Sequence, residues 1–122
     1  MADKQQEHER KVQEHQIQYN RYQEILTELL NQLAAVSSQI QEHAVVDETL
    51  AQIPPEKREG RKCFKMIGGV LVDKTVDEVI RLLGAEVKEL TKSKEAVEKE
   101  ITRVKSELNE WMAKNKVKIV RQ

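Results

Sequence analysis

Two apolar stripes with the spacing of a coiled coil flank one short hairpin in this chain, and this layout constrains the fold more than any other feature. Both stripes advance by alternating steps of three and four residues, which is the 3.5-residue repeat of a coiled-coil seam. The first contains Tyr19, Tyr22, Leu26, Leu29, Leu33, Val36 and Ile40. The second contains Val76, Ile80, Leu83, Val87, Leu90, Lys94, Val97, Ile101, Val104, Leu108 and Trp111. The pattern predicts two long helices that pack against each other.

The turning residues are concentrated between the stripes. Pro54 and Pro55 end the first helix, because proline lacks the backbone donor and restricts the residue before it. Gly68 and Gly69 supply the positive φ angles that a two-residue hairpin turn requires. The second helix starts at a capping box that begins with Thr75. We therefore expect a tail over 1–11 that is disordered, a helix over 12–52, a loop over 53–60, a hairpin over 61–74, a helix over 75–114 and a tail over 115–122.

Folding the chain back at the hairpin pairs positions whose numbers sum to about 127, so that seam meets seam. Leu26 then faces Ile101, and Tyr19 faces Leu108. In this register His43 faces Gly84, which leaves room for the imidazole ring. Lys94 is the charged residue of the second stripe. It either fixes the register or extends its amine to solvent.

The hairpin carries apolar side chains on both faces, and a lone two-stranded hairpin is marginal in water. One pair of helices cannot cover both faces, and open strand edges invite other chains. We therefore expect a mainly α fold, a long antiparallel two-helix coiled coil joined by a single β-hairpin that assembles into an intersubunit β-barrel. The alternative is a hairpin folded back on its own helices. The expected interface consists of Cys63, Phe64, Met66, Ile67, Gly68, Gly69, Val70, Leu71 and Val72.

The composition restricts the class of protein further. Charged residues make up 34% of the chain and aromatic residues 3%, which suits solvated, paired helices. The formal net charge is zero, which gives no general argument for a nucleic-acid partner, and the single cysteine argues against a disulfide framework. Cys63 lies on a predicted strand without a nearby histidine or second cysteine, so we expect it to be buried in the barrel rather than reactive. The sequence shows neither a signal peptide nor a membrane span. We expect a cytoplasmic protein, with the nucleus left open as a second compartment.

The central segment resembles the signature of β-type subunits of the prefoldin family. It reads Arg61-Lys-Cys-Phe-Lys-Met-Ile-Gly-Gly-Val-Leu-Val-Asp-Lys-Thr-Val76. The segments Tyr19-Asn-Arg-Tyr-Gln-Glu-Ile-Leu26 and Trp111-Met-Ala-Lys-Asn-Lys116 are also similar to that family. The resemblance implies a heterohexamer of α- and β-type prefoldin subunits whose hairpins form a double barrel. It also implies an ATP-independent co-chaperone that captures unfolded actin and tubulin and delivers them to the cytosolic group II chaperonin, with no cofactor and no nucleic-acid or membrane partner.

Apolar residues at the free ends of the helices, about 8–26 and 104–122, suggest how such a protein binds its clients. Exposed apolar groups at several tips would hold an unfolded chain by avidity. The expected client-binding residues are Val12, Ile17, Tyr19, Tyr22, Leu108, Trp111, Met112, Val117 and Ile119. The alternative for Tyr19 and Trp111 is that they cap the seam.

Other polar residues indicate no chemistry. His8 and His15 lack a third metal ligand at suitable spacing, so we expect them to be solvated. Lys114, Lys116, Lys118 and Arg121 form a basic end that complements the helix dipole. The sequence offers no nucleophile–base pair or phosphate loop, so we do not expect an enzyme. A structural coiled-coil adaptor that joins folded proteins remains the rival hypothesis.

Overall fold

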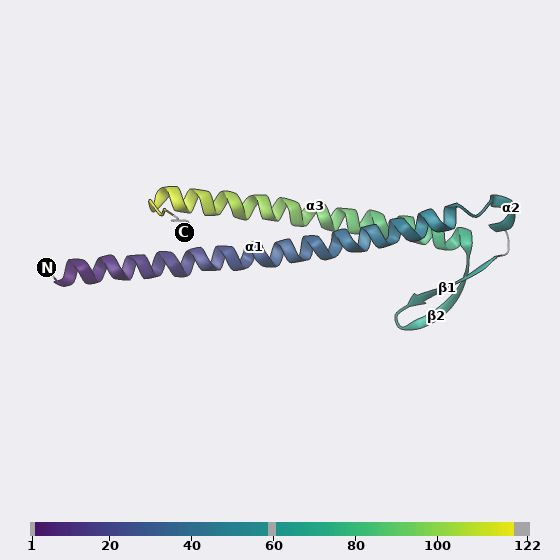
Figure 1. Ribbon diagram of the computed structural model, residues 1–122, viewed down its shortest axis with the longest axis horizontal. Coiled ribbons are helices and arrows are strands. Elements are labelled where there is room, and N and C mark those ends of the chain that lie inside the picture. Colours follow the sequence, from purple (N-terminus) through teal and green to yellow (C-terminus); the bar gives the residue numbers. More distant parts are fainter. Residues whose placement is uncertain (1, 59–60, 119–122) are drawn as a thin grey trace. The chain divides into compact units, whose positions relative to one another are not determined.

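The computed structural model describes residues 2–58 and 61–118 (Figure 1). Helix α1 spans Ala2–Ala51, the short helix α2 Pro55–Arg58, strand β1 Lys62–Ile67, strand β2 Val70–Thr75 and helix α3 Val76–Lys114. The predicted order of helix, hairpin and helix is therefore confirmed, whereas the segment 53–60, predicted as a loop, contains the short helix α2. The chain divides into two compact units. We call Met1–Leu33 with Ala96–Gln122 the terminal unit and Ala34–Glu95 the hairpin unit.

The core of the terminal unit is the predicted seam. Leu26 of α1 is buried together with Ile101, Val104 and Leu108 of α3. Partly buried residues pack against these four: Tyr19, Tyr22, Leu29, Leu33, Val97, Trp111 and Met112. Burying one such aliphatic side chain contributes about 1.5–3 kcal/mol. Within this unit, the pairing that the sequence predicted brings Leu26 and Ile101 into one cluster.

The hairpin unit contains a two-stranded antiparallel sheet. Its register runs from Lys62 opposite Thr75 to Ile67 opposite Val70. The turn residues Gly68 and Gly69 have φ angles of 57° and 82°. Positive φ at both central positions is the signature of a type I′ turn, whose twist matches that of the strands. The glycine pair thus acts as the sequence predicted.

Helix α3 begins where the capping residue predicts. The hydroxyl oxygen of Thr75 accepts a hydrogen bond from the backbone N–H of Glu78 at 3.2 Å. The backbone N–H of Val76 donates to the carbonyl oxygen of Arg61 at 3.1 Å, and the Val76 side chain is fully buried. Asp77 and Glu78 lie in the first turn, where the helix dipole favours negative charge.

Helix α1 begins ten residues earlier than the sequence predicted. The prediction of a disordered tail over 1–11 is wrong for the described part of that tail, which is helical. Residues 3–14 are exposed, so their polarity predicted the exposure correctly. It did not predict the conformation, because extending an existing helix adds one hydrogen bond per residue and avoids the cost of a new nucleus. No glycine or proline interrupts this stretch.

A Schellman turn closes α3 at its C-terminal end. The backbone N–H of Lys116 donates to the carbonyl oxygen of Ala113 at 3.4 Å, and that of Val117 donates to the carbonyl oxygen of Met112 at 2.9 Å. Lys116 has a φ of 54°, in the left-handed region that usually holds glycine. The turn bends the chain after Lys114, the residue where the sequence predicted that the helix would end.

The left-handed residue of this turn gives a stability prediction. Lys116→Gly should raise the free energy of unfolding by about 0.5–1 kcal/mol, because glycine removes the Cβ penalty at positive φ. The exposed helical control Ala96→Gly should lower it by about 1 kcal/mol. Urea unfolding followed by circular dichroism measures both effects. A loss of stability in Lys116→Gly that matches the control would contradict the left-handed turn.

Candidate functional site

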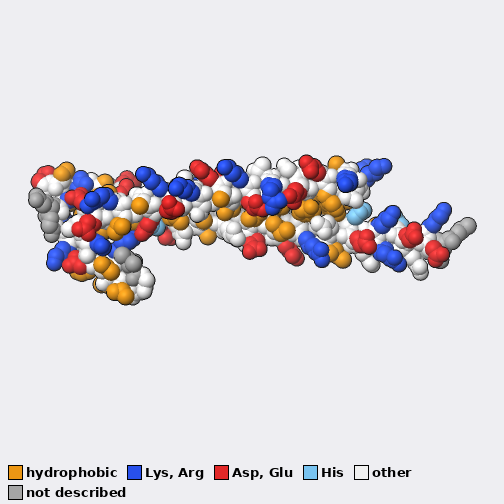
Figure 2. Space-filling model, turned by 180° about the vertical axis from the view of Figure 1, so that it is seen from behind, with side chains coloured by type: hydrophobic (Ala, Val, Ile, Leu, Met, Phe, Trp, Pro, Cys, Tyr) orange, Lys and Arg blue, Asp and Glu red, His pale blue; other side chains and the backbone are white. Residues whose placement is uncertain are grey.

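One face of the hairpin is open. Opposite residues of an antiparallel pair lie on the same face, and alternate residues of a strand lie on opposite faces. Phe64 pairs with Asp73 and Met66 pairs with Leu71, so Phe64 and Leu71 share a face. Their exposed fractions are 68% and 61%. Figure 2 shows hydrophobic side chains gathered on this hairpin.

The other face of the hairpin turns toward α3. Lys65 lies on that face, and its amine is 3.1 Å from a carboxylate oxygen of Glu86. Cys63 and Val72, on the same face, are half-buried. This face is therefore held against the chain's own helix through its central lysine, and the face that carries Phe64 and Leu71 is the one left open. Val70 stays 63% exposed beside the turn.

The predicted interface residues are accounted for as follows. Phe64, Val70 and Leu71 are exposed, and Cys63 and Val72 are half-buried. Gly68 and Gly69 form the turn. The side chains of Met66 and Ile67 lie outside the described residues. Among the described side chains, the open face carries Phe64 and Leu71.

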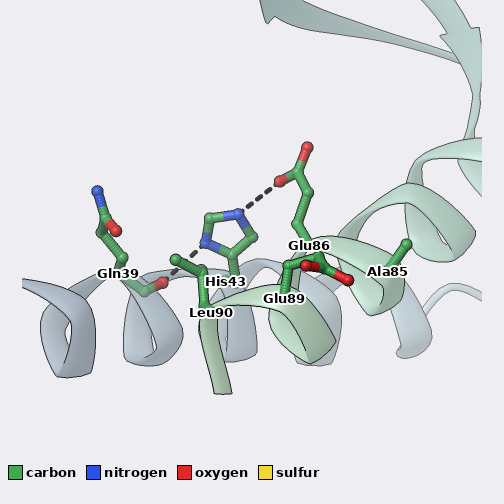
Figure 3. A pocket seen from close by; sticks show the side chains of 6 residues that line it. All are labelled: Gln39, His43, Ala85, Glu86, Glu89 and Leu90. Atoms are coloured by element: carbon green, nitrogen blue, oxygen red, sulfur yellow. Dashed lines mark hydrogen bonds and ion pairs between the residues drawn. The ribbon is translucent and has the colours of Figure 1, made fainter. Parts of the chain in front are cut away.

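A polar cluster joins three elements of the hairpin unit, and Figure 3 shows its residues from α1 and α3. The Nε2 atom of His43 on α1 is 2.6 Å from the Oε2 atom of Glu86 on α3. The Nδ1 atom is 2.7 Å from the carbonyl oxygen of Gln39. Lys65 on β1 bonds the other oxygen of Glu86. Both ring nitrogens face acceptors, so both contacts are hydrogen bonds only in the protonated imidazolium.

These contacts shift both titrations. The hydrogen bond to Glu86, followed by that to Gln39, raises the pKa of His43 above its ordinary value of 6.5. The hydrogen bond from His43, with help from Lys65, lowers the pKa of Glu86 below 4.5. The register predicted from the sequence placed His43 opposite Gly84. That prediction is wrong, because the residue of α3 that His43 contacts is Glu86. A Cβ at Gly84 would meet no described atom within 4 Å, whereas the carboxylate two residues further along offers the ring a hydrogen bond.

Arg58 on α2 closes the loop that precedes the hairpin. Its Nε atom donates to the carbonyl oxygen of Ile53 at 2.7 Å, and its Nη1 atom is 3.7 Å from Asp77 at the start of α3. The sequence analysis missed Arg58, Lys65 and Glu86. About a third of the residues are charged, with both signs present, so many different ion pairs are possible. The sequence alone does not indicate which of these pairs form.

The predicted client-binding residues separate into exposed and packed groups. Val12 and Ile17 are 52% and 54% exposed. Leu108 is buried, with 8% exposed, and Met112 packs against the seam core. Val117 is half-buried in the turn after α3, and Ile119 lies outside the described residues.

The aromatic residues of the tip pack together. Trp111 contacts Tyr22, with ring centroids 5.8 Å apart, and His15, with ring centroids 5.7 Å apart and the two ring planes nearly perpendicular. Tyr19 also packs against the seam core. Tyr19 and Trp111 therefore pack against the end of the seam, as the alternative to a client-binding role proposed. His15 is half-buried against Trp111, which corrects the expectation that it is solvated. Its aromatic ring gains more from this contact than from full exposure.

Over residues 2–58 and 61–118, we find no group of three histidine, cysteine or acidic side chains arranged to hold a metal ion. No helix within those ranges is long and apolar enough to span a bilayer.

Comparison with known proteins identifies the family. The family model described as prefoldin subunit matches residues 13–122. Prefoldin subunit 2 of Homo sapiens is 30% identical over 102 residues, which are 84% of this chain and 64% of that protein. The chain therefore spans less than two thirds of the length of such relatives. Prefoldin subunit 2 of Saccharomyces cerevisiae is 28% identical over 87% of this chain and 92% of its own length.

A solved structure has the same fold. The prefoldin beta subunit from Thermococcus strain KS-1 superposes with a TM-score of 0.69, covering 80% of this chain and 82% of its own, at 20% identity. Two long helices joined by a hairpin are thus the fold of a β-type prefoldin subunit. On the family match over most of its length, the chain belongs to the prefoldin family.

The polar cluster predicts a pH dependence of stability. Because the pKa of His43 is raised in the folded protein, its contribution is fully present below the unfolded value and is lost as the pH rises through the folded value. Stability should therefore fall as the pH rises from the ordinary histidine value of 6.5 through the raised folded value, by no more than about 1 kcal/mol, because solvent screens this half-exposed pair. Urea unfolding at several pH values should show this slope weakened in His43→Gln. The slope should persist in His8→Gln. An unchanged slope in His43→Gln would refute the assignment of the pH dependence to His43.

Proposed function

We propose that this protein is a subunit of a heterohexameric co-chaperone, assembled with other α- and β-type prefoldin subunits. The complex would capture unfolded actin and tubulin without ATP and deliver them to the cytosolic chaperonin. The family membership supports the class of function, and the observation that carries the proposal is the open hairpin face bearing Phe64 and Leu71. We place this activity in the cytoplasm, with the nucleus as a second compartment.

The open hairpin face favours assembly for two reasons. The sheet has two strands in the described chain, so each strand has one edge without a backbone partner. Such edges pair readily with strands of other chains. The exposed Phe64 and Leu71 also add apolar area that a partner would bury at about 25 cal/mol per Å². A barrel shared between subunits covers both the edges and the face.

The tip supports a capture mechanism that needs no catalytic group. Val12 and Ile17 stay exposed on α1 and do not belong to the seam core. Several such tips in one complex would bind an unfolded chain by avidity, each with modest affinity. Release then needs the loss of a few weak contacts. We infer a binding function rather than an enzymatic one.

Assembly through the hairpin can be tested by substitution. Phe64→Glu and Leu71→Glu should each abolish hexamer formation with α- and β-type prefoldin subunits, because a buried, unpaired carboxylate costs several kcal/mol. Native mass spectrometry of the mixture measures the loss. Val45→Glu is the matched control, since Val45 is 56% exposed but lies outside the hairpin. Normal hexamers from the hairpin variants, or binding of one folded partner without a hexamer, would favour the adaptor instead.

Client capture can be tested in the assembled complex. The double variant Val12→Gln with Ile17→Gln should suppress the aggregation of diluted, denatured actin severalfold less well than the unmodified complex, with assembly unchanged. Light scattering measures aggregation. The control is Leu30→Gln with Val46→Gln, whose residues are 49% and 46% exposed but lie away from the tip. An equal loss of aggregation suppression in both double variants would show that exposed apolar residues at the tip have no special role in client capture.

A further inference from the structure

A groove in the terminal unit lies between α1 and the Schellman turn that follows α3. Its volume is about 690 Å³. On the α1 side it is lined by residues one to two turns apart, among them His8, Lys11 and His15. On the other side it is lined by residues 115–118. The turn creates this groove, because it bends the chain out of the helical path after Lys114.

The lining of the groove has one sign of charge. Lys11, Lys116 and Lys118 line it, and none of its described lining residues is a carboxylate. The chain as a whole has as many acidic as basic residues, 21 of each, so this separation is local. The dipole at the end of α3 accounts for lysines near that end. It does not account for Lys11, which lies on α1.

The groove also offers apolar contacts. Val12 lines it and is 52% exposed, while Tyr19 and Val117 line it and are half-buried. A purely ionic ligand would leave this apolar area in water. A ligand that combines carboxylates with an apolar side chain would satisfy both parts of the lining.

We propose that this groove binds an extended acidic peptide segment that carries an apolar side chain. The proposal rests on the proposed function, because it names the chemistry of one segment that the tip recognises. Carboxylates of the segment pair with Lys11, Lys116 and Lys118, and its apolar side chain packs on Val12 and Tyr19. The charges then select the segment and the apolar contact adds affinity.

A nucleic acid fits the groove less well. The chain has no net charge to attract a polyanion over a distance, and the groove provides three lysines rather than a long basic track. Stacking of bases requires an exposed aromatic face. The aromatic residue of the lining, Tyr19, is partly buried against the seam core.

The experiment uses the full chain in its reconstituted complex and a short synthetic peptide of glutamate and aspartate with two leucines, labelled with a fluorophore. Anisotropy measures its affinity. Emission of Trp111 gives a second signal, because it is the one tryptophan of the chain and its ring contacts His15 in the groove lining. Peptides with lysines in place of the acidic residues, or serines in place of the leucines, test each part of the recognition.

Charge reversal at the groove is the decisive variant. Lys11→Glu with Lys118→Glu should weaken binding of the acidic peptide roughly tenfold or more. The charge-matched control Lys99→Glu with Lys105→Glu, on exposed positions of α3 outside the groove, should weaken it much less. Circular dichroism checks that both variants keep their helices. Capture of denatured actin by the unmodified complex is measured in parallel. Unchanged peptide binding in the groove variant, with actin capture intact in the unmodified complex, would refute this proposal alone, whereas failure of the unmodified complex to capture actin would refute the proposed function.

Several results would overturn the proposal. Equal loss of binding in the groove variant and its control would reduce the effect to overall charge. Equal affinity for an oligonucleotide, with the same sensitivity to Lys11→Glu, would make the groove a polyanion site. Loss of binding in a chain ending at Lys118 would assign the peptide to residues 119–122 rather than to the groove.

Discussion

Burial of the heptad seam between α1 and α3 is the interaction on which the terminal unit depends. Helices this rich in charged residues are marginal alone, so most of their stability must come from an apolar face packed on a partner. Leu26, Ile101, Val104 and Leu108 supply that core. The stripe leaves the remaining faces of both helices in water, which explains how a chain with 34% charged residues keeps an ordered fold. Most of the exposed charge contributes little to stability.

In the hairpin unit, a small two-stranded sheet is held in place by contacts on one face while its other face stays exposed. Glu86 takes part in this by bonding His43 of α1 and Lys65 of β1 at once. Arg58 secures the preceding loop against the start of α3. These polar contacts orient one face of the hairpin and leave Phe64 and Leu71 exposed on the other. A fully apolar contact would hold the hairpin too, but it would also place more apolar surface in the free subunit.

The sequence predicted the elements better than the contacts between them. Heptad spacing and the pair Gly68-Gly69 act through local geometry, so both helices and the turn followed from periodicity and backbone preference. The described part of the predicted tail over 1–11 was mistaken for a disordered segment, because polarity reports exposure and says little about the extension of a helix. The predicted register was two residues away from the observed contact of His43. This difference decides whether the ring lies opposite Gly84 or bonds Glu86. The spacing of apolar residues does not determine such a small shift, because Gly84 and Glu86 both lie next to seam positions.

The tip must balance packing against exposure. Each apolar side chain that joins the seam, as Leu108 and Trp111 do, stabilises the helix ends but becomes less available to a partner. Val12 and Ile17 remain exposed, and they do so on a helix whose position is already fixed by the seam below them. If this end binds clients as proposed, a surface held in this way would lose little conformational entropy on meeting an unfolded chain. The rigid seam and the exposed end of α1 are therefore two parts of one arrangement, in which packing at the core allows the tip to stay open.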